Sequence, residues 1–186
     1  SATDRQLPIY CVQRDQKMLA ISFDAAWGNE DTQQLIDILG KYNVKATFFV
    51  VGDWVDKYPE SVKALHDAGH EVMNHSNSHA HMSQLSSEAI VADVEACNDK
   101  IEAVTGVRPT LIRPPYGEYD NNVITSIRSI GMEPIQWDVD SLDWKDLPAG
   151  EITERVVSRV QPGSIVLFHN AALHTPEALP DRKSTR

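Results

Sequence analysis

Two histidines four residues apart, in the stretch His75-Ser-Asn-Ser-His79, carry side chains of the kind that bind divalent metal ions. If this stretch turns helically, the two imidazoles share one face and both reach a single ion. Taken alone, the spacing is a weak motif and more often belongs to a polar loop that is rich in histidine. His81 follows closely, and we interpret it as a rim or surface residue.

A carboxylate and a guanidinium stand at the ends of two further apolar runs. Asp24 ends one run and is followed by Ala-Ala-Trp-Gly. A carboxylate in this position can act as the general base on a water molecule, or it can cap the turn before Gly28. Arg113 is followed by two prolines, which restrict the backbone after it. On its own, Arg113 would be interpreted as an exposed loop arginine.

The stretch Asp140-Ser-Leu-Asp143-Trp144 combines carboxylates with an indole, and this mixture suits a sugar site. An aromatic face packs on a sugar ring, while carboxylates bind hydroxyl groups or orient a histidine. A surface turn explains the same residues equally well. His169 ends the last apolar run, where it is either an acid at the rim of a cavity or a core histidine with its hydrogen bonds satisfied.

These residues need a scaffold, and the alternation of short apolar runs with segments of helical period predicts one. The predicted strands are 7–12, 18–23, 44–51, 70–74, 110–112, 133–137 and 164–168, and the predicted helices are 32–42, 60–68, 87–105, 121–130 and 151–160. Strands that alternate with helices indicate an α/β fold with a parallel sheet, which we assign to one domain over 1–186. Most of the polar residues above directly follow a predicted strand, and functional groups of such folds gather at the carboxyl ends of strands.

Composition and charge exclude several classes of function. The chain has 186 residues and a formal net charge of −10, so it lacks the excess of cations that a general nucleic-acid binder needs. No stretch approaches the roughly 20 apolar residues of a membrane-spanning helix. No signal-peptide pattern follows Ser1.

Taken together, these residues resemble the polysaccharide deacetylases of the NodB-homology type, the family-four carbohydrate esterases. The resemblance runs from about Met18 to Pro180, with five motifs in the family's order, and Phe-Asp-Ala-Ala-Trp-Gly is most similar to a sporulation-associated branch. It implies an irregular (β/α) barrel. It also implies a metal-dependent hydrolase that removes N-acetyl groups from peptidoglycan or a chitin-like glycan.

The resemblance further implies a role for each candidate site residue. His75 and His79 would be ligands of a divalent metal, zinc or cobalt. Asp24 would be the catalytic base tuned by Arg113, and His169 the general acid oriented by Asp143. The backbone N–H of Tyr116 would help to form the oxyanion hole, and Leu167 and Trp144 would line the pocket for the acetyl methyl group.

The sequence departs from the family pattern at two places. Ala25 stands where the family has a second aspartate, the third metal ligand. Either Asp24 binds the metal as well, or a nearby group such as Asn74 or Asp31 substitutes, or the site holds metal weakly and works poorly. The family would also continue after Pro180 with another helix and strand, whereas this sequence reaches Arg186, so we expect a barrel without its last helix and strand.

The implied partner is an acetylated polysaccharide, which places the protein outside the cell or at the cell surface; the sequence leaves the oligomeric state open. One alternative within the enzyme class is an O-acetyl esterase that acts on xylan. Another alternative is a carbohydrate-binding pseudoenzyme with a weakened metal site. Ala25 favours the pseudoenzyme, and the retention of a base, an acid and both of their partners opposes it.

Overall fold

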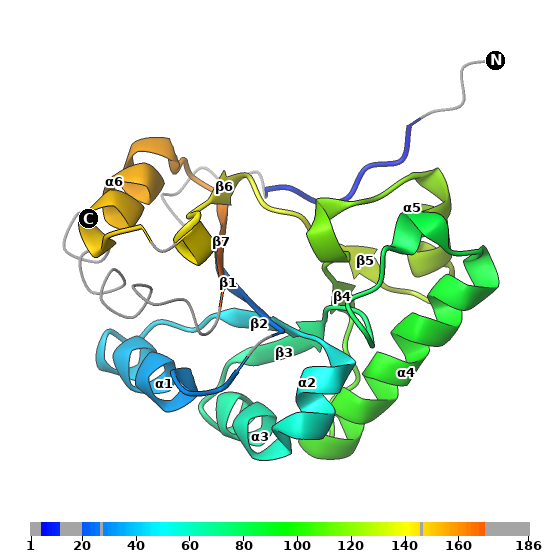
Figure 1. Cartoon of the computed structure of the whole chain (residues 1–186), viewed down its shortest axis with the longest axis horizontal. Coiled ribbons are helices and arrows are strands. Elements are labelled where there is room, and N and C mark those ends of the chain that lie inside the picture. Colours follow the sequence, from blue (N-terminus) through cyan, green and yellow to red (C-terminus); the bar gives the residue numbers. More distant parts are fainter. Residues whose placement is uncertain (1–4, 12–19, 27, 146, 170–186) are drawn as a thin grey trace.

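A computed structural model describes residues 5–11, 20–26, 28–145 and 147–169, and shows seven parallel strands that curl into a half-barrel with helices around it (Figure 1). The order of the strands across the sheet is β5-β4-β3-β2-β1-β7-β6. The strands are β1 Ala20–Ala25, β2 Thr47–Val50, β3 Glu71–Asn74, β4 Leu111–Ile112, β5 Glu133–Pro134, β6 Val139–Asp140 and β7 Ile165–His169. The predicted α/β barrel architecture is confirmed.

Six α-helices and three short 3₁₀ turns connect these strands. They are α1 Thr32–Lys41, α2 Gly52–Lys57, α3 Pro59–Asp67, η1 Met82–Gln84, α4 Ser87–Thr105, η2 Pro115–Gly117, α5 Asn121–Ser129, η3 Asp143–Lys145 and α6 Ala149–Arg159. Helix α4 has the predicted bounds because both of its ends are capped. The Ser86 side chain accepts a hydrogen bond from the backbone N–H of Ala89, and Gly106 closes the last turn in the left-handed conformation.

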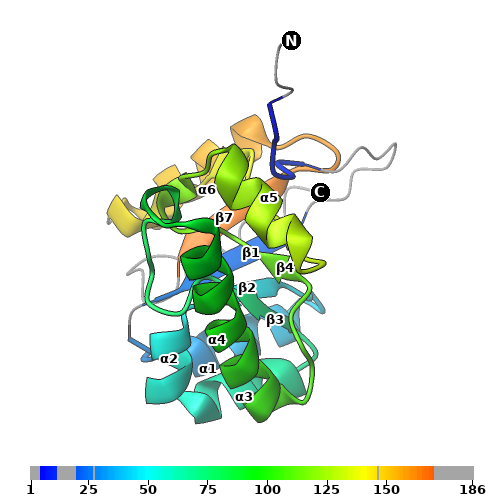
Figure 2. The same cartoon turned by 90° about the vertical axis from the view of Figure 1, so that its right-hand side faces the viewer.

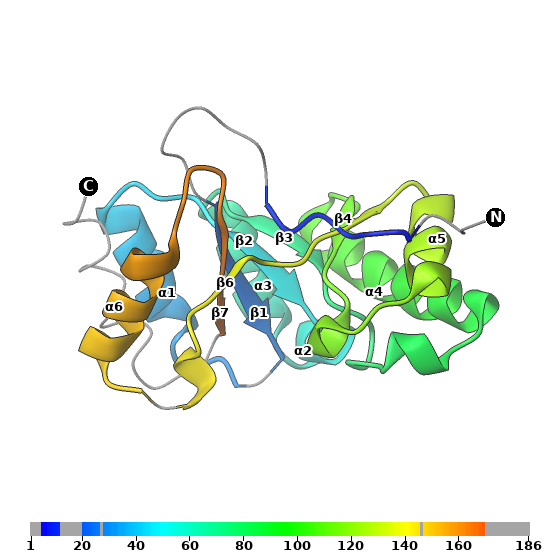
Figure 3. The same cartoon turned by 90° about the horizontal axis from the view of Figure 1, so that it is seen from above.

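The two faces of the sheet bury different kinds of side chains. The outer face packs against the helices through a large apolar cluster that includes Phe23, Phe48, Val50 and Phe168. Figure 3 shows the strands between α1 and α6 at one end and α4 and α5 at the other. In Figure 2, α4 and α5 lie side by side next to β3 and β4. The inner face holds a smaller apolar cluster that includes Phe49, and the buried guanidinium of Arg113 packs on the Phe49 ring, so the candidate chemistry lies inside the half-barrel.

Strand register brings distant polar residues to one edge of the sheet. Asp24 of β1 pairs with His169 of β7, although the two residues are far apart in the sequence. On the other side of β1, the backbone N–H of His75 donates to Val50 O, and that of Arg113 donates to Asn74 O. The carboxyl ends of five adjacent strands therefore meet at one mouth, as the sequence predicted.

The two outermost strands, β5 and β6, leave a gap that the N-terminal segment 5–11 spans. Ile9 forms a parallel bridge with Ile135 just after β5, and Cys11 forms an antiparallel bridge with Ser164 just before β7. In its described part, residues 7–11, the predicted strand 7–12 is present only as isolated bridges, because Ile9 and Cys11 pair with different partners. Residue 12 lies outside the described residues.

Two further expectations concern the C-terminal residues and membrane-spanning helices. The proposed absence of a last helix and strand concerns residues 170–186, which lie outside the described residues. In the part of the chain that is described, no helix is long and apolar enough to cross a membrane.

Candidate active site

The carboxylate of Asp24 lies at the base of the mouth and is held by a buried arginine. Arg113 Nη1 donates to Asp24 Oδ1 at 2.8 Å, and Nη2 donates to Ser22 Oγ at 2.8 Å and to Gln136 O at 3.2 Å. The guanidinium carbon stands 4.3 Å from the ring centroid of Phe49, and the residue is 0% exposed. Arg113 is therefore a buried partner of Asp24 and not the exposed loop residue that its position alone would predict.

Asp24 is ionised at neutral pH despite its burial. Burial by itself would raise the pKa of this carboxyl, but the electrostatic interactions with His75 and Arg113 outweigh burial and lower the pKa below its usual value. His75 is itself neutral near pH 7, because burial lowers its pKa. The permanent positive charge that keeps Asp24 ionised is therefore the guanidinium of Arg113.

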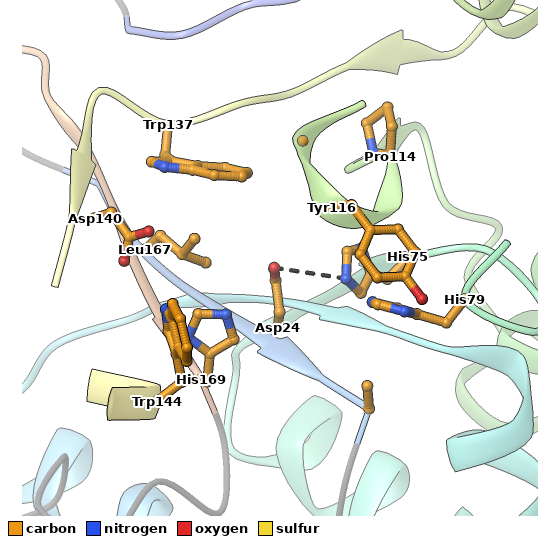
Figure 4. Close-up of a pocket in the computed structure, with 12 residues that line it drawn as sticks. Asp24, His75, His79, Pro114, Tyr116, Trp137, Asp140, Trp144, Leu167 and His169 are labelled. Carbon is orange, nitrogen blue, oxygen red and sulfur yellow. Dashed lines mark ion pairs between the residues drawn. The ribbon is translucent and has the colours of Figure 1, made fainter. Parts of the chain in front are cut away.

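The imidazole of His75 has a defined tautomer. Its Nδ1 lies 2.6 Å from the backbone oxygen of Arg113, which can only accept, so Nδ1 carries the proton. Its Nε2 faces Asp24 Oδ2 at 3.5 Å (Figure 4). His79 stands beside it, with ring centroids 5.0 Å apart, and burial followed by the charge of His75 lowers the pKa of His79 to about 4. Both histidines are thus neutral and present unprotonated nitrogens near pH 7.

The loop that carries both histidines is held by helix α4. Asp93 Oδ2 accepts a hydrogen bond from Ser76 Oγ at 2.8 Å and another from the backbone N–H of Asn77 at 3.1 Å. Ser76 and His79 both have positive φ, at 72° and 57°, a conformation that L-residues rarely adopt. The loop is not the helical turn that would bring residues 75 and 79 onto one face; these fixed turns bring the two rings together instead.

On the other side of Asp24, His169 is paired with Asp143, which is fully buried. Asp143 Oδ1 lies 2.9 Å from His169 Nδ1, and Oδ2 accepts from the backbone N–H of His169 at 2.8 Å. Burial opposes the charged imidazolium, but the hydrogen bond to Asp143 and the nearby carboxylates outweigh burial and raise the pKa of His169. His169 can therefore hold a proton at a pH where an ordinary histidine loses it.

A cavity of about 450 Å³ opens between these groups. Seven of the nine predicted site residues line it, and Figure 4 shows them around Asp24. They are Asp24, His75, His79, Tyr116, Trp144, Leu167 and His169. The other two, Arg113 and Asp143, lie behind the wall and hold Asp24 and His169. The structure thus brings all nine residues into one site.

The cavity wall also contains residues that sequence reasoning did not assign to the site. These are Ala26, Pro114, Gly117, Trp137 and Asp140. Asp140 lay in the stretch considered for sugar binding, and alternation along β1 could have indicated Ala26, two residues after Asp24. Trp137 offered no signal of its own, because it ended an apolar run that was interpreted only as a strand.

The donors present do not make a complete metal site. The cavity offers two neutral imidazoles, whereas catalytic zinc sites use three protein ligands. Within the described residues, no group of three or more His, Cys, Asp or Glu side chains is arranged to hold a metal ion. Ala25 is 1% exposed and packs in the outer apolar cluster.

The two proposed replacement ligands do not fill this gap. Neither Asn74 nor Asp31 is among the described residues that line the cavity. The side-chain amide of Asn74 is engaged elsewhere: its nitrogen donates to Val94 O and Asn98 Oδ1, and its oxygen accepts from the backbone N–H of Ser76. Neither named substitute therefore stands at the cavity, and we retain a double role for Asp24 and a weak site as the two leading interpretations.

Comparisons with known proteins agree with this geometry. Residues 12–135 match the family model described as "Polysaccharide deacetylase". The chain is 38% identical, over 86% of its length, to the peptidoglycan-N-acetylmuramic acid deacetylase PdaC of Bacillus subtilis. It is 34% identical, over 82% of its length, to a peptidoglycan-N-acetylglucosamine deacetylase of Bacillus cereus. The chain spans only 33% of the first protein and 55% of the second.

Solved structures include a similar protein without activity. The CE4 family pseudoenzyme BA3943 from Bacillus anthracis matches with a TM-score of 0.92 at 36% identity, over 96% of this chain and 63% of that one. A mutant of the same pseudoenzyme, described as having restored enzymatic activity, matches with a TM-score of 0.93 at 37% identity, over 96% of this chain and 65% of that one.

Proposed function

Because the chain belongs to the polysaccharide deacetylase family, the CE4 carbohydrate esterases, we propose that it hydrolyses N-acetyl groups of a polysaccharide. One observation carries this proposal. An ionised carboxylate held by Arg113 and an imidazole whose pKa is raised by Asp143 flank the same cavity, on the adjacent strands β1 and β7. Such a pair supplies a base and an acid at the same pH.

In the proposed reaction, Asp24 accepts a proton from a water molecule as the water oxygen bonds to the amide carbonyl carbon. The negative oxygen that develops is met by the backbone N–H of Tyr116, and one such donor typically contributes about 3 kcal/mol. His169 then gives its proton to the amide nitrogen as the carbon–nitrogen bond breaks. The products are acetate and a free sugar amine.

For the substrate we propose peptidoglycan or a chitin-like glycan, at the cell surface or outside the cell. The similarity to two peptidoglycan deacetylases supports peptidoglycan. The cavity agrees with a sugar ligand, since it combines the aromatic rings of Tyr116, Trp137 and Trp144 with carboxylates.

For the metal we propose weak binding of zinc or cobalt by His75 and His79. Two neutral imidazoles side by side at the cavity support binding, and the alanine at position 25 accounts for the weakness. Metal analysis of the purified protein, with and without added zinc, measures this directly.

The test of the proposed function is acetate release from N-acetylated chito-oligosaccharides and from muropeptides, with and without added zinc or cobalt. We expect the protein to release acetate. Added metal should increase the rate of release, and the Asp24→Asn substitution should abolish it. Faster release from acetylated xylan than from either amide would identify an O-acetyl esterase instead. Release that persists in Asp24→Asn would assign the base to another group.

A second candidate is a carbohydrate-binding pseudoenzyme. It is favoured by the alanine at position 25 and by the match to the pseudoenzyme BA3943. Glycan binding without acetate release from any acetylated sugar would establish this function in place of hydrolysis.

A further inference from the structure

The turn that leads from β6 to Asp143 holds a leucine in an unusual conformation. Leu142 has a φ of 56°, in the left-handed region that a bulky L-residue rarely adopts. A residue other than glycine persists in this region only where the surrounding structure holds it there. Interactions within the 140–143 turn must therefore stabilise Leu142 in this conformation.

The carboxylate of Asp140 closes the turn. Its Oδ1 accepts a hydrogen bond from the backbone N–H of Leu142 at 2.8 Å, two residues further along the chain. An aspartate that binds the backbone in this way forms an Asx turn, in which a side-chain oxygen takes the place of a backbone carbonyl. Asp140 lines the cavity, where Figure 4 shows it next to Leu167. A cavity residue thus fixes the backbone that directly precedes Asp143.

The 140–143 turn is anchored to the sheet at its start. Asp140 pairs with Leu167 of β7, and the backbone N–H of Ser141 donates to Leu167 O at 3.1 Å. Ser141 Oγ then accepts from the backbone N–H of Asp143 at 3.3 Å, a longer contact than the one that Asp140 makes. The direction of the chain after this anchor therefore depends on Leu142, the residue that Asp140 holds.

The turn brings Asp143 to His169. Asp143 is fully buried, and its two oxygens bind the ring Nδ1 and the backbone N–H of His169. A hydrogen bond weakens steeply when its geometry departs from the ideal. A carboxylate that meets two donors of one residue therefore tolerates little displacement, and the turn must place it accurately.

We propose that Asp140 is a positioning residue for His169: its carboxylate holds Leu142 in the left-handed turn that places Asp143 against the imidazole. This inference rests on the proposed function, in which His169 is the acid that protonates the leaving amine. It assigns Asp140 a role through the backbone and through Asp143.

Asp140 also carries a charge, and two substitutions separate the charge from the turn. Burial lowers the pKa of His169, whereas the hydrogen bond to Asp143 raises it and the charge of Asp140 adds to that rise. Asp140→Asn removes the charge but keeps an oxygen for the N–H of Leu142, since asparagine forms the same Asx turn. Asp140→Glu keeps the charge but carries the carboxylate one carbon further from the backbone, so it no longer closes the turn.

Nuclear magnetic resonance of the full chain measures the two ring nitrogens of His169, at an alkaline pH where the ring is neutral; His169→Gln identifies their signals. We expect the wild type and Asp140→Asn to keep the proton on Nδ1, where Asp143 accepts it. In Asp140→Glu the proton should be shared between both nitrogens, and acetate release should be at least about tenfold lower than in Asp140→Asn. Asp140→Ala, which removes the turn and the charge, should resemble Asp140→Glu. Asp120→Glu, which moves the carboxylate that caps α5, is the matched control and should keep the wild-type tautomer.

The tautomer and the acetate release distinguish failure of this inference from failure of the proposed function. An Asp140→Glu protein that keeps the proton on Nδ1 overturns the inference, as does a wild type without that tautomer. Loss of the tautomer in Asp140→Asn, or in Asp120→Glu, also overturns it, because the charge or any weakened cap would then be responsible. Equal acetate release by Asp140→Asn and Asp140→Glu overturns the inference and leaves hydrolysis standing. The expected tautomers in a protein that releases no acetate support the positioning by Asp140 and overturn hydrolysis.

Discussion

A single carboxylate, that of Asp143, binds both the ring and the backbone of His169. Oδ1 lies 2.9 Å from the ring nitrogen Nδ1, and Oδ2 accepts the backbone N–H of the same residue at 2.8 Å. Because Nδ1 is engaged, Nε2 is the nitrogen left to act toward the cavity. Asp143 thus fixes the position, the tautomer and the charge of the imidazole together.

Asp143→Asn should shift the alkaline limb of the pH profile to lower pH. His169 acts as an acid only while protonated, so activity is present below its pKa and is lost as the pH rises through it. Asp143 raises that pKa, and asparagine supplies no charge to maintain the rise. We expect acetate release to fall about 10²-fold as well. An unchanged limb in the pH–rate profile would show that another group limits the reaction.

Asp24→Asn should lower stability as well as remove activity. The change leaves the guanidinium of Arg113 fully buried without a charged partner, and breaking a buried pair typically costs about 3 kcal/mol or more. Denaturant unfolding measures the loss. Asp37→Asn, at an exposed position of α1, is the matched control and should change stability little. Equal stability of both variants would mean that the Arg113 pair contributes nothing.

Ala25→Asp should tighten zinc binding at least about tenfold, because position 25 is where the family has its third metal ligand and the longer side chain can leave the apolar cluster that holds the alanine methyl group. Calorimetric zinc titration measures the change. Ala26→Asp adds the same charge on the cavity wall and controls for electrostatic attraction alone. Equal gains in the two variants would show that charge, and not the position of a ligand, raises the affinity. Unchanged affinity in Ala25→Asp would show that Asp24 already completes the site.

Asp93→Ala should weaken both the histidine loop and its metal affinity. The change removes the acceptor for Ser76 and Asn77, next to two left-handed backbone turns. We expect a loss of about 1–3 kcal/mol in unfolding free energy and of roughly tenfold or more in zinc affinity. Glu154→Ala, at an exposed position of α6, is the control. A loss of stability without a loss of zinc affinity would limit Asp93 to a structural role.

Long elements with a clear apolar periodicity could be predicted from the sequence, whereas the shortest helix and strands could not. The helix 87–105 was predicted with its observed bounds, because its apolar stripe and its caps agree. Helix α2, Gly52–Lys57, was missed because six residues are too few to show a period. Strand β6 has only two residues, within an acidic run, and owes its existence to pairing with β7. Strand β5 ends at Pro134, before the predicted 137, because Gln136 donates to Ile9 instead of continuing the ladder.

The candidate site could be assembled from the sequence because its residues stand directly after strands. The sequence could not predict the residues that hold the site residues in position, because these interactions are contacts between segments that are distant in the sequence. Asp93 lies within the predicted helix 87–105, and nothing in the periodicity of that helix indicates that its carboxylate holds the histidine loop. The stack of His81 on Tyr116 joins two loops that no local pattern connects.

The bridging of segment 5–11 between β5 and β7 has a consequence for how the molecule is made. This stretch is synthesised before Ile135 and Ser164, yet these are the residues that its backbone pairs with. The half-barrel therefore cannot be sealed until nearly the entire described chain has left the ribosome. Until then, the backbone groups next to β5 and β7 that this segment pairs with remain open to strands of other molecules. Segment 5–11 is therefore synthesised first and paired last. A nascent molecule in which this pairing is delayed is the most exposed to aggregation.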